Sequence, residues 1–529
     1  MRLSNFLVGM LACAAITACS NDDNGNATNN GTESDGNTYL AVNLVANNDA
    51  MTRAESEFSN GTEAESTVTK ARFYFFNGTG TAYPVSNGVN YIDVDNFTWT
   101  PDPGNSSSTN GQNVTTSSDI VLVLNGVDAV PSSVVVLLNP PTTLGNTSMA
   151  LSALRTTTAD YANSSYTSSG TFVMSNSVYA DGGNIIDAVN IQGNLETSAA
   201  AANLNPVQIY VERAVAKVSV TQQAGASNPD TGIDFGTGTN TNVYAKITGW
   251  TLANVRPATK LLKELNNSWL QTQPFADWND ADNHRSYWAE GVSTAVTNTN
   301  SWDEITDSND KYCNENAGSN NTTTTLTQLL VAAQLVDSEG NPVEIAEIMS
   351  RRMTVAELKD WILRALEQQH YIAYQSASEP TTYTQIDADD IDFRAKTSTD
   401  PSSVRSYEAI ATLASGAPAQ LYERQSDGTY STVTDEVVNE YLAEYVARIW
   451  NDGMTYYFTP IQHLGNMSGV VRNHLYQINI QGVSGLGTPV YDPDSEIITE
   501  EVINQHSYLS AQINILAWNV VSNDVTLGQ

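Results

Sequence analysis

Hydrophobic residues in most of this chain occur in short runs separated by polar, turn-forming residues. From about Val68 onward, apolar or alternating runs are interrupted by Asn, Gly, Ser and Pro, a pattern typical of an all-β sandwich or barrel. In segment 476–481 apolar and polar residues alternate strictly, which predicts a strand with one buried face. Other predicted strands are Ala71–Phe76, Ile120–Leu124, Val134–Leu138, Val207–Val211, Val215–Val220 and Val243–Leu252. The expected fold class is therefore mainly β.

A segment rich in Ala and Asn divides the chain into two blocks. It runs from Thr197 to Asn205 and is closed by Pro206, so we expect a domain boundary there. The predicted N-terminal β-sandwich domain covers residues 54–205, and the predicted C-terminal β-sandwich domain covers residues 206–529. The chain is long enough for two or three domains of ~150 residues each.

Two stretches of the second block have helical periodicity and predict a partly helical insertion at about residues 313–450. The first begins with a capping box at Thr354 and Glu357, and apolar residues follow at spacings of three and four. The second runs from about Asp435 to Ile449 and has a similar apolar stripe. We expect both stripes to face a hydrophobic core, which is more common than a partner-binding role.

The amino terminus has the features of a lipoprotein signal peptide. Arg2 precedes an apolar run that ends at Ala18, and this run is shorter than the roughly 20 residues that span a bilayer. The run closes with a lipobox, which predicts removal of residues 1–18 and lipidation of Cys19. The alternative is an ordinary secretory signal in which Cys19 has no role. The polar segment that follows, to about Asn37, predicts a disordered tether.

The chain is strongly acidic, and its charge argues against two classes of partner. It has 23 Lys and Arg against 58 Asp and Glu, a net charge of -35. Without a basic stripe, nucleic acids and anionic membrane surfaces are poor partners. The cysteines predict no intramolecular disulfide, because Cys13 lies in the signal peptide, Cys19 is the lipidation candidate and Cys313 is left alone.

No motif predicts catalysis, a cofactor or a metal site, so we expect that the chain is not an enzyme. The five histidines are scattered, and Cys313 has no sequence signature of an activated thiol. Two acidic clusters lack the glycine and the distal glutamate of a calcium loop and are expected to be solvated turns. These clusters are Asp277, Asp280 and Asp282, and Asp387, Asp389, Asp390 and Asp392. A secreted glycan-degrading enzyme stays open as an alternative, because a sequence cannot reveal two carboxylates about 5 to 10 Å apart.

Several blocks of the sequence resemble a known family. Val211–Val218 resembles the strand signature of the Bacteroidales fimbrillin superfamily, the subunits of type V pili. In the tail, Val471–Tyr476, Gly485–Gly487 and Ile515–Val520 resemble the C-terminal region of the shaft fimbrillins of minor fimbriae in oral Bacteroidales. Two further family-like blocks are Asn283–Ala289 and Tyr312–Asn316. The resemblance covers the second block of the chain well and the first hardly at all.

The resemblance implies a fold, a maturation pathway and a set of partners. It implies two transthyretin-like β-sandwich domains, a precursor anchored by lipid to the outer membrane, and polymerisation into a cell-surface fimbria that supports adhesion. It also implies that an arginine-specific protease removes a propeptide, here residues 19–53, by cleavage between Arg53 and Ala54. Without the resemblance, Arg53 would be interpreted as a surface arginine. The implied partners are other copies of the chain and accessory anchor and tip proteins.

Two strands are expected to take part in assembly. The propeptide contains a predicted strand at 39–46 with Leu40, Val42 and Leu44 on one face. Its removal would open a groove, and the last strand, about Leu509–Leu527, would enter the groove of a neighbouring subunit, as in donor-strand complementation. The donor residues expected to matter are Leu516, Trp518, Val520, Val525 and Leu527.

Two alternatives stay open for these strands and for the chain as a whole. In the first, the last segment is simply the final strand of its own domain. In the second, the chain is a surface lipoprotein that does not polymerise and that binds glycan or protein as a tip adhesin or an anchor.

Overall fold

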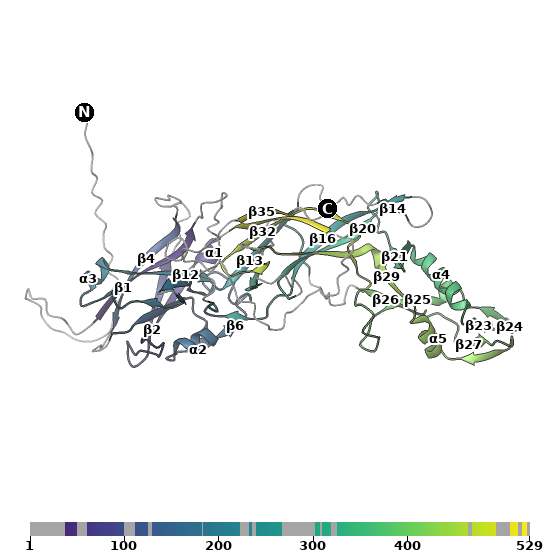
Figure 1. Ribbon diagram of the computed structural model, residues 1–529, viewed down its shortest axis with the longest axis horizontal. Helices are drawn as coiled ribbons and strands as arrows, with labels where there is room; N and C mark the ends of the chain where they lie inside the picture. Colours follow the sequence, from purple (N-terminus) through teal and green to yellow (C-terminus); the bar gives the residue numbers. More distant parts are fainter. Residues whose placement is uncertain are drawn as a thin grey trace, which may run out of the picture. The chain divides into compact units, whose positions relative to one another are not determined.

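The computed structural model describes residues 38–49, 61–99, 112–124, 130–181, 184–222, 232–234, 240–266, 302–306, 309–318, 325–463, 468–492, 508–516 and 521–525. All of these residues belong to one compact unit, Gly36–Gln529. Their architecture is mainly β, with short helices between strands (Figure 1), which confirms the expected fold class. No helix in this described part of the chain is long and apolar enough to cross a membrane. The predicted signal peptide and tether lie outside the described residues.

The N-terminal part of the chain forms a large sheet around the first hydrophobic core. Its strand order is β11-β1-β12-β7-β5-β2-β3, with β4 paired to β1 and β10 paired to β5. Strands β2 and β5 are almost continuously buried, as their uninterrupted apolar sequences require. The bounds are β1 Thr38–Asp49, β2 Val68–Phe76, β3 Tyr91–Trp99, β4 Gln112–Leu124, β5 Ser133–Leu138, β7 Met174–Asn176, β10 Val189–Asn190, β11 Leu195–Glu196 and β12 Val207–Arg213.

Two sheets of the second half enclose a second core between them, as in a β-sandwich. Their strand orders are β18-β13-β32-β34-β35 and β16-β20-β30-β33. Val218 and Ile478 of the first sheet share one buried cluster with Trp250 and Val331 of the second. The strand predicted at 476–481 is part of β32. The bounds are β13 Val215–Gln222, β16 Tyr244–Ala253, β18 Lys311–Asn314, β20 Gln328–Val336, β30 Met454–Pro460, β32 Leu475–Ser484, β33 Thr488–Pro489, β34 Tyr508–Leu516 and β35 Val521–Val525.

An insertion between β20 and β30 has a third core of its own. Its sheets have the orders β22-β21-β29-β26-β25 and β24-β23-β27-β28. Helix α4 packs on β21 and β25, and α5 packs on β26 (Figure 1). The insertion comprises β21 Ile345–Ile348, β22 Arg351–Met353, α4 Val355–Glu367, β23 Ile372–Ser376, β24 Glu379–Gln385, η4 Ala388–Asp390, β25 Ile391–Ala395, β26 Glu408–Leu413, β27 Leu421–Arg424, β28 Tyr430–Val433, α5 Asp435–Leu442 and β29 Val446–Trp450.

The first predicted helix is confirmed and the second is wrong in its length. Helix α4 starts at the expected capping box, in which the side chain of Thr354 accepts from the Glu357 amide and the Glu357 carboxylate accepts from the Thr354 amide. Helix α5 ends at Leu442, and β29 follows instead of more helix. Strand β29 pairs with β21 on one edge and with β26 on the other. This pairing on both edges outweighs a local apolar spacing that also fits a helix.

The chain passes from the first sheet to the second at Ala214. The predicted boundary segment contains helix α3, Ala199–Leu204, but β12, which follows it, still belongs to the first sheet, and β13 begins the second. The remaining elements are α1 Glu63–Ser66, η1 Thr142–Leu144, α2 Leu151–Thr156, β6 Thr158–Ala159, β8 Tyr179–Asp181, β9 Asn184–Ile186, β14 Gly232–Asp234, β15 Asn240–Asn242, β17 Thr259–Lys260, β19 Asn316–Gly318, β31 Ser468–Val470 and η5 Asn451–Gly453.

Candidate assembly strands and their buried anchors

The first strand of the structure, β1, lies inside the N-terminal sheet and is paired on both edges. One edge pairs with β4 in antiparallel register along the whole strand, from Thr38 opposite Leu124 to Asp49 opposite Gln112. The other edge pairs with β12 in parallel register and, near its start, with β11 in antiparallel register. A strand is therefore present where the sequence predicts one at 39–46, and it is longer than predicted.

Three successive side chains of β1, from Leu40 to Val42, are buried. Leu40 and Val42 have no exposed surface and belong to the first core, and Ala41 between them is 1% exposed. The strand is thus covered on both faces, and helix α3 packs against β1 and β4. Leu40 and Val42 confirm the core-facing half of the predicted pattern. The Leu44 side chain lies outside the described residues.

The predicted processing residues are close to β1 in sequence but outside the described residues. Cys19, Arg53 and Ala54 are in this group. Strand β1 ends at Asp49, before Arg53, and the first described helix, α1, begins after Ala54. A cut between Arg53 and Ala54 would therefore separate all of β1 from the rest of the fold.

Helix α1 carries a buried carboxylate, Glu65, that sequence reasoning missed. Its backbone amide donates to Thr62 Oγ1, and its carboxylate accepts from the Thr62 amide at 2.6 Å, which forms a capping box. The carboxylate also binds Lys217 Nζ of β13 at 2.8 Å and accepts a 2.5 Å hydrogen bond from Tyr312 Oη of β18. Glu65 has no exposed surface, so α1 is tied to strands of the second sheet by a buried charge.

Arg213, the last residue of β12, binds the same helix. Its Nε donates to the Glu65 carbonyl at 2.7 Å, and its Nη2 donates to Ser66 Oγ at 3.0 Å. Its backbone amide and Nη1 both donate to Asn473 Oδ1 at 3.3 Å. Asn473 has a φ of 58°, a left-handed conformation that asparagine tolerates better than most residues. Helix α1, the end of β12 and the turn before β32 therefore meet at the Arg213 guanidinium.

The charges around Glu65 stabilise one another. Burial alone would raise the pKa of Glu65, but the hydrogen bond and charge of Lys217, with the Tyr312 hydroxyl and the Thr62 amide, lower it overall. Burial alone would lower the pKa of Lys217, but Asp310 and Glu65 raise it overall. Lys217 binds Asp310 at 2.8 Å. Both Glu65 and Lys217 are therefore charged at neutral pH, and the pair is held in place by further hydrogen bonds.

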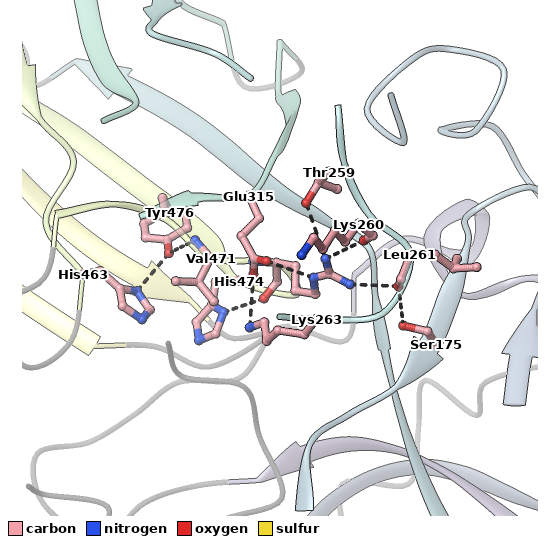
Figure 2. A network of polar contacts seen from close by, with 11 residues as sticks. Ser175, Thr259, Lys260, Leu261, Lys263, Glu315, His463, Val471, His474 and Tyr476 are labelled. Carbon is pink, nitrogen blue, oxygen red and sulfur yellow. Dashed lines mark hydrogen bonds and ion pairs between the residues drawn. The ribbon is translucent and has the colours of Figure 1, made fainter. Parts of the chain in front are cut away.

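A second buried network joins the two halves of the fold (Figure 2). Arg472, which is fully buried, donates through Nη1 to the Leu261 carbonyl at 3.1 Å, and its Nε lies 3.4 Å from Glu315 Oε1. Glu315 also binds Lys263 Nζ at 3.0 Å. Ser175 of β7, in the first sheet, donates to the same Leu261 carbonyl at 3.0 Å. The network thus connects a strand of the first sheet to the segment that leads into β32.

Three of the six sequence blocks that resemble fimbrillins meet in these two networks. Val211–Val218 supplies Arg213 and Lys217, Tyr312–Asn316 supplies Tyr312 and Glu315, and Val471–Tyr476 supplies Arg472 and Asn473. The block Asn283–Ala289 lies outside the described residues. Glu65 and Lys263 were not singled out from the sequence. The capping box at Thr62 was a signal for Glu65, but nothing local marks its partners.

The C-terminal segment forms a hairpin rather than one long strand. Strand β34 pairs with β32 from Leu516 opposite Leu475 to Tyr508 opposite Ser484, and β35 returns antiparallel to β34. In the sequence, Ile513 and Ile515 alternate with polar residues, and the apolar positions then change to Leu516 and Trp518. This change of apolar face coincides with the chain reversal between β34 and β35. Among the described strands of this sheet, β35 is at the edge. Of the predicted donor residues, Leu516 ends β34 and Val525 ends β35, whereas Trp518, Val520 and Leu527 lie outside the described residues.

Other candidate residues have structural surroundings. Cys313 is fully buried in β18, and burial raises its pKa to about 12, so it is a poor nucleophile. Asp387 caps the turn η4 by accepting from the Asp389 amide at 2.9 Å. Within the described ranges no group of three or more His, Cys, Asp or Glu could hold a metal ion. The cluster at Asp277 lies outside those ranges.

One part of the chain matches a protein-family model. Residues 448–524 match the family described as major fimbrial subunit protein type IV, Fimbrillin, C-terminal. This region contains β30, β32, β34 and most of β35, and the network residues Arg472 and Asn473. No curated protein sequence matches the chain. The match is confined to the C-terminal part of the chain and supports a fimbrial subunit.

Solved structures with some similarity to the chain come from Bacteroidales. A candidate cell adhesion protein from Parabacteroides distasonis is 14% identical, with a TM-score of 0.41 and coverage of 90% of this chain and 96% of that one. A fimbrilin from Porphyromonas gingivalis is 12% identical, with a TM-score of 0.36 and coverage of 92% and 98%. A tip fimbrial protein from Porphyromonas gingivalis, truncated at its C-terminus, is 9% identical, with a TM-score of 0.33 and coverage of 91% and 100%. Scores of this size do not establish a shared fold.

Proposed function

We propose that the chain is the structural subunit of a cell-surface fimbria that supports adhesion. In this proposal it is exported as a lipoprotein, loses its propeptide and then polymerises by strand exchange. The observation that carries the proposal is the position of β1, which is paired on both edges within the first sheet and yet ends before Arg53. The family match of residues 448–524 supports the fimbrial role.

Removal of β1 would leave a gap one strand wide. Strands β4 and β12 would each present a free edge with unpaired N–H and C=O groups, which is a template for another strand. The apolar residues beside the gap would include Leu122 of β4 and Val207 and Ile209 of β12, which share the first core with Leu40 and Val42. A donor strand with aliphatic residues at alternate positions would restore both the hydrogen bonds and the burial.

The uncleaved chain would resist exchange for a thermodynamic reason. Burial of Leu40 and Val42 contributes about 3 to 6 kcal/mol in addition to the ladder hydrogen bonds, at roughly 1.5 to 3 kcal/mol for each side chain. While β1 is covalently attached, its effective concentration at its own site is far above that of any neighbouring subunit. Cleavage removes this intramolecular advantage, so assembly begins only after maturation.

The Glu65 anchor would keep the mature subunit folded after cleavage. Helix α1 lies on the mature side of Arg53 and leads directly into β2 at Val68. Its ties to Arg213, Lys217 and Tyr312 do not involve β1. Loss of the propeptide would therefore open the gap without releasing β2 from the sheet.

The donor in this proposal is the C-terminal segment. Strand β35 is held by β34 along one edge in the described residues, so it can detach by breaking one ladder. Transfer of β35 with its flanking residues to a neighbour would carry the apolar residues Trp518, Val520, Val525 and Leu527 toward the gap. Leu516 would follow if its pairing with Leu475 at the end of β34 also opened. Burial of about four of them would contribute on the order of 6 to 12 kcal/mol before ordering costs. A joint of that strength would persist.

The precursor and the fibre would have different partners. Lipid on Cys19 would hold the precursor at the outer membrane, where an arginine-specific protease would cleave between Arg53 and Ala54. The mature subunit would then bind other copies of the chain, with accessory anchor and tip proteins at the two ends of the fibre.

The amino-terminal residue of protein sheared from cells tests the proposal. We expect Ala54 at the start of the sheared protein and lipidated Cys19 only in the membrane fraction. If the surface-exposed protein starts at Cys19 and is monomeric, the chain is a lipid-anchored adhesin or anchor and the polymerisation proposal is wrong.

A further inference from the structure

The turn between β21 and β22 has an unfavourable backbone for its residues. Ile348 pairs with Arg351, so Met349 and Ser350 form a two-residue hairpin turn. Their φ angles are 48° and 62°, and both are positive. Such turns strongly favour Asn-Gly or related pairs, because other side chains crowd the backbone when φ is positive.

The same chain uses the favoured residues at another hairpin. Ser86 pairs with Val89, and the turn between them is Asn87-Gly88, with φ angles of 45° and 79°. Two hairpins of one protein thus share a turn geometry but differ in turn chemistry. The turn geometry therefore does not require Met349 and Ser350, because Asn-Gly fits the same kind of turn in this protein.

Packing within the subunit does not compensate for this strain. Met349 is 78% exposed, so it loses the burial that a methionine gains in a core. An exposed, unbranched and polarizable side chain on a strained turn is suited to fill an irregular gap on another surface. Strained backbone often marks sites of recognition.

The surroundings of the turn are basic on an otherwise acidic protein. Arg351 and Arg352 of β22 are exposed, and Arg352 Nε lies 3.0 Å from Glu347. Glu347 also binds Arg448 Nη1 of β29 at 3.0 Å. Arg351 forms no salt bridge among the described residues, whereas the whole chain carries a net charge of -35. A surface that is positive and apolar is therefore complementary to the acidic surface of the same protein.

We propose that the Met349-Ser350 turn, together with Arg351 and Arg352, docks onto a second copy of this chain and reinforces the contact between neighbouring subunits. This inference rests on the proposed function, because it concerns subunits that are already joined in a fibre. Met349 inserts into the neighbour, Arg351 pairs with one of its carboxylates, and Arg352 adds positive charge beside the contact while it stays bound to Glu347. An anionic membrane is a poorer occupant, since recognition of lipid head groups takes clusters of about four to eight basic residues.

The test uses three variants of the full-length chain, produced in cells that assemble fibres. Met349→Asn with Ser350→Gly removes the methionine and gives the turn its favoured residues. Ser350→Gly alone relaxes the turn and keeps Met349, so it is the matched control. Arg351→Ser removes one unpaired charge. For each variant we would measure the melting temperature of the mature monomer, the dissociation rate of sheared fibres and binding to phosphatidylglycerol vesicles.

The monomer of the double variant is expected to melt at a higher temperature, because its turn has the favoured residues. Its fibres are expected to dissociate about tenfold faster, because each contact loses one buried methionine. Ser350→Gly should raise the melting temperature and leave fibre dissociation unchanged. Arg351→Ser should speed dissociation roughly two- to fivefold in low salt and have little effect in high salt.

Two results would overturn the inference and leave the proposed function intact. The first is a double variant whose fibres dissociate at the wild-type rate. The second is that the wild-type chain binds the vesicles and the double variant does not, because the turn would then face a membrane. Absence of fibres from the wild-type chain would refute the proposed function and this inference together.

Discussion

The charge of Glu65 is expected to stabilise the fold strongly although it lies outside any assembly strand. Glu65→Gln keeps the length of the side chain, and glutamine can still close the capping box with Thr62. The substitution removes the negative charge that Lys217 Nζ contacts at 2.8 Å. It therefore isolates the buried ion pair from the helix cap.

The magnitude follows from the surroundings of the pair. Removal of one partner of a buried ion pair costs about 3 to 5 kcal/mol, because a charge is left unpaired. Lys217 keeps a second partner, Asp310, whose side chain is 28% exposed. The Arg213 bond to the Glu65 carbonyl does not depend on the substitution. We therefore expect a loss of about 2 to 4 kcal/mol in the free energy of unfolding.

Urea unfolding of the precursor without its signal peptide, followed by tryptophan fluorescence, measures this loss. The midpoint should fall while the slope with urea concentration stays the same. Asp95→Asn is a matched control, because it breaks an ion pair of 3.1 Å with Lys70 in which the Asp95 side chain is 68% exposed, and exposed pairs contribute only about 0 to 1 kcal/mol. If both variants unfold at the same urea concentration, the Glu65 anchor does not stabilise the fold as described.

Four other outcomes are expected. Arg53→Ala should leave export and lipidation intact but prevent assembly, because β1 stays in its gap, and normal fibres in electron micrographs would contradict this. Deletion of 519–529 should give a folded, matured monomer that cannot polymerise. A degraded protein would show that the segment only completes its own domain, and fibres of normal length would show that the donor strand is elsewhere. Reductant should not dissociate fibres, because Cys313 is buried, and loss of fibres with dithiothreitol would refute this. The free energy of unfolding should fall as pH drops below 4.5, the ordinary pKa of a glutamate carboxyl, because the pKa of Glu65 is lower in the folded state. If the free energy of unfolding of Glu65→Gln falls by the same amount, this carboxyl is not the cause.

Local sequence patterns were sufficient for several parts of the fold. The alternation at 476–481 and the apolar runs of β2 and β5 predict strands because burial on one or two faces imposes a period that a sequence displays directly. The start of α4 follows from a capping box of four residues. The core-facing positions of β1 follow from Leu40 and Val42, which stand at alternate positions of the strand.

Pairing between distant segments was decided only in the tertiary structure. The apolar stripe that begins in α5 continues past Leu442, and β29 is a strand because β21 and β26 flank it. The segment after Leu516 turns back on β34, which a change of apolar face could not distinguish from a continuing strand. For β29 the deciding hydrogen bonds join residues far apart in the chain, so no local window contains them. For β35 the partners are close in sequence, but the apolar pattern by itself does not mark the reversal.

The anchors of the candidate site depend on tertiary structure for the same reason. Glu65, Arg213 and Arg472 lie in different parts of the sequence, and each looks like an ordinary surface charge by itself. The resemblance to fimbrillins marked the blocks around Arg213 and Arg472 without a physical reason for their composition. The reason is burial: a charge that loses its water must find an opposite charge and hydrogen-bond partners, and only the folded chain brings Lys217 and Glu315 to those positions. The sequence by itself determined the strands with clear apolar runs or alternation, and the tertiary structure decided the remaining pairings and which of the few charges are buried together.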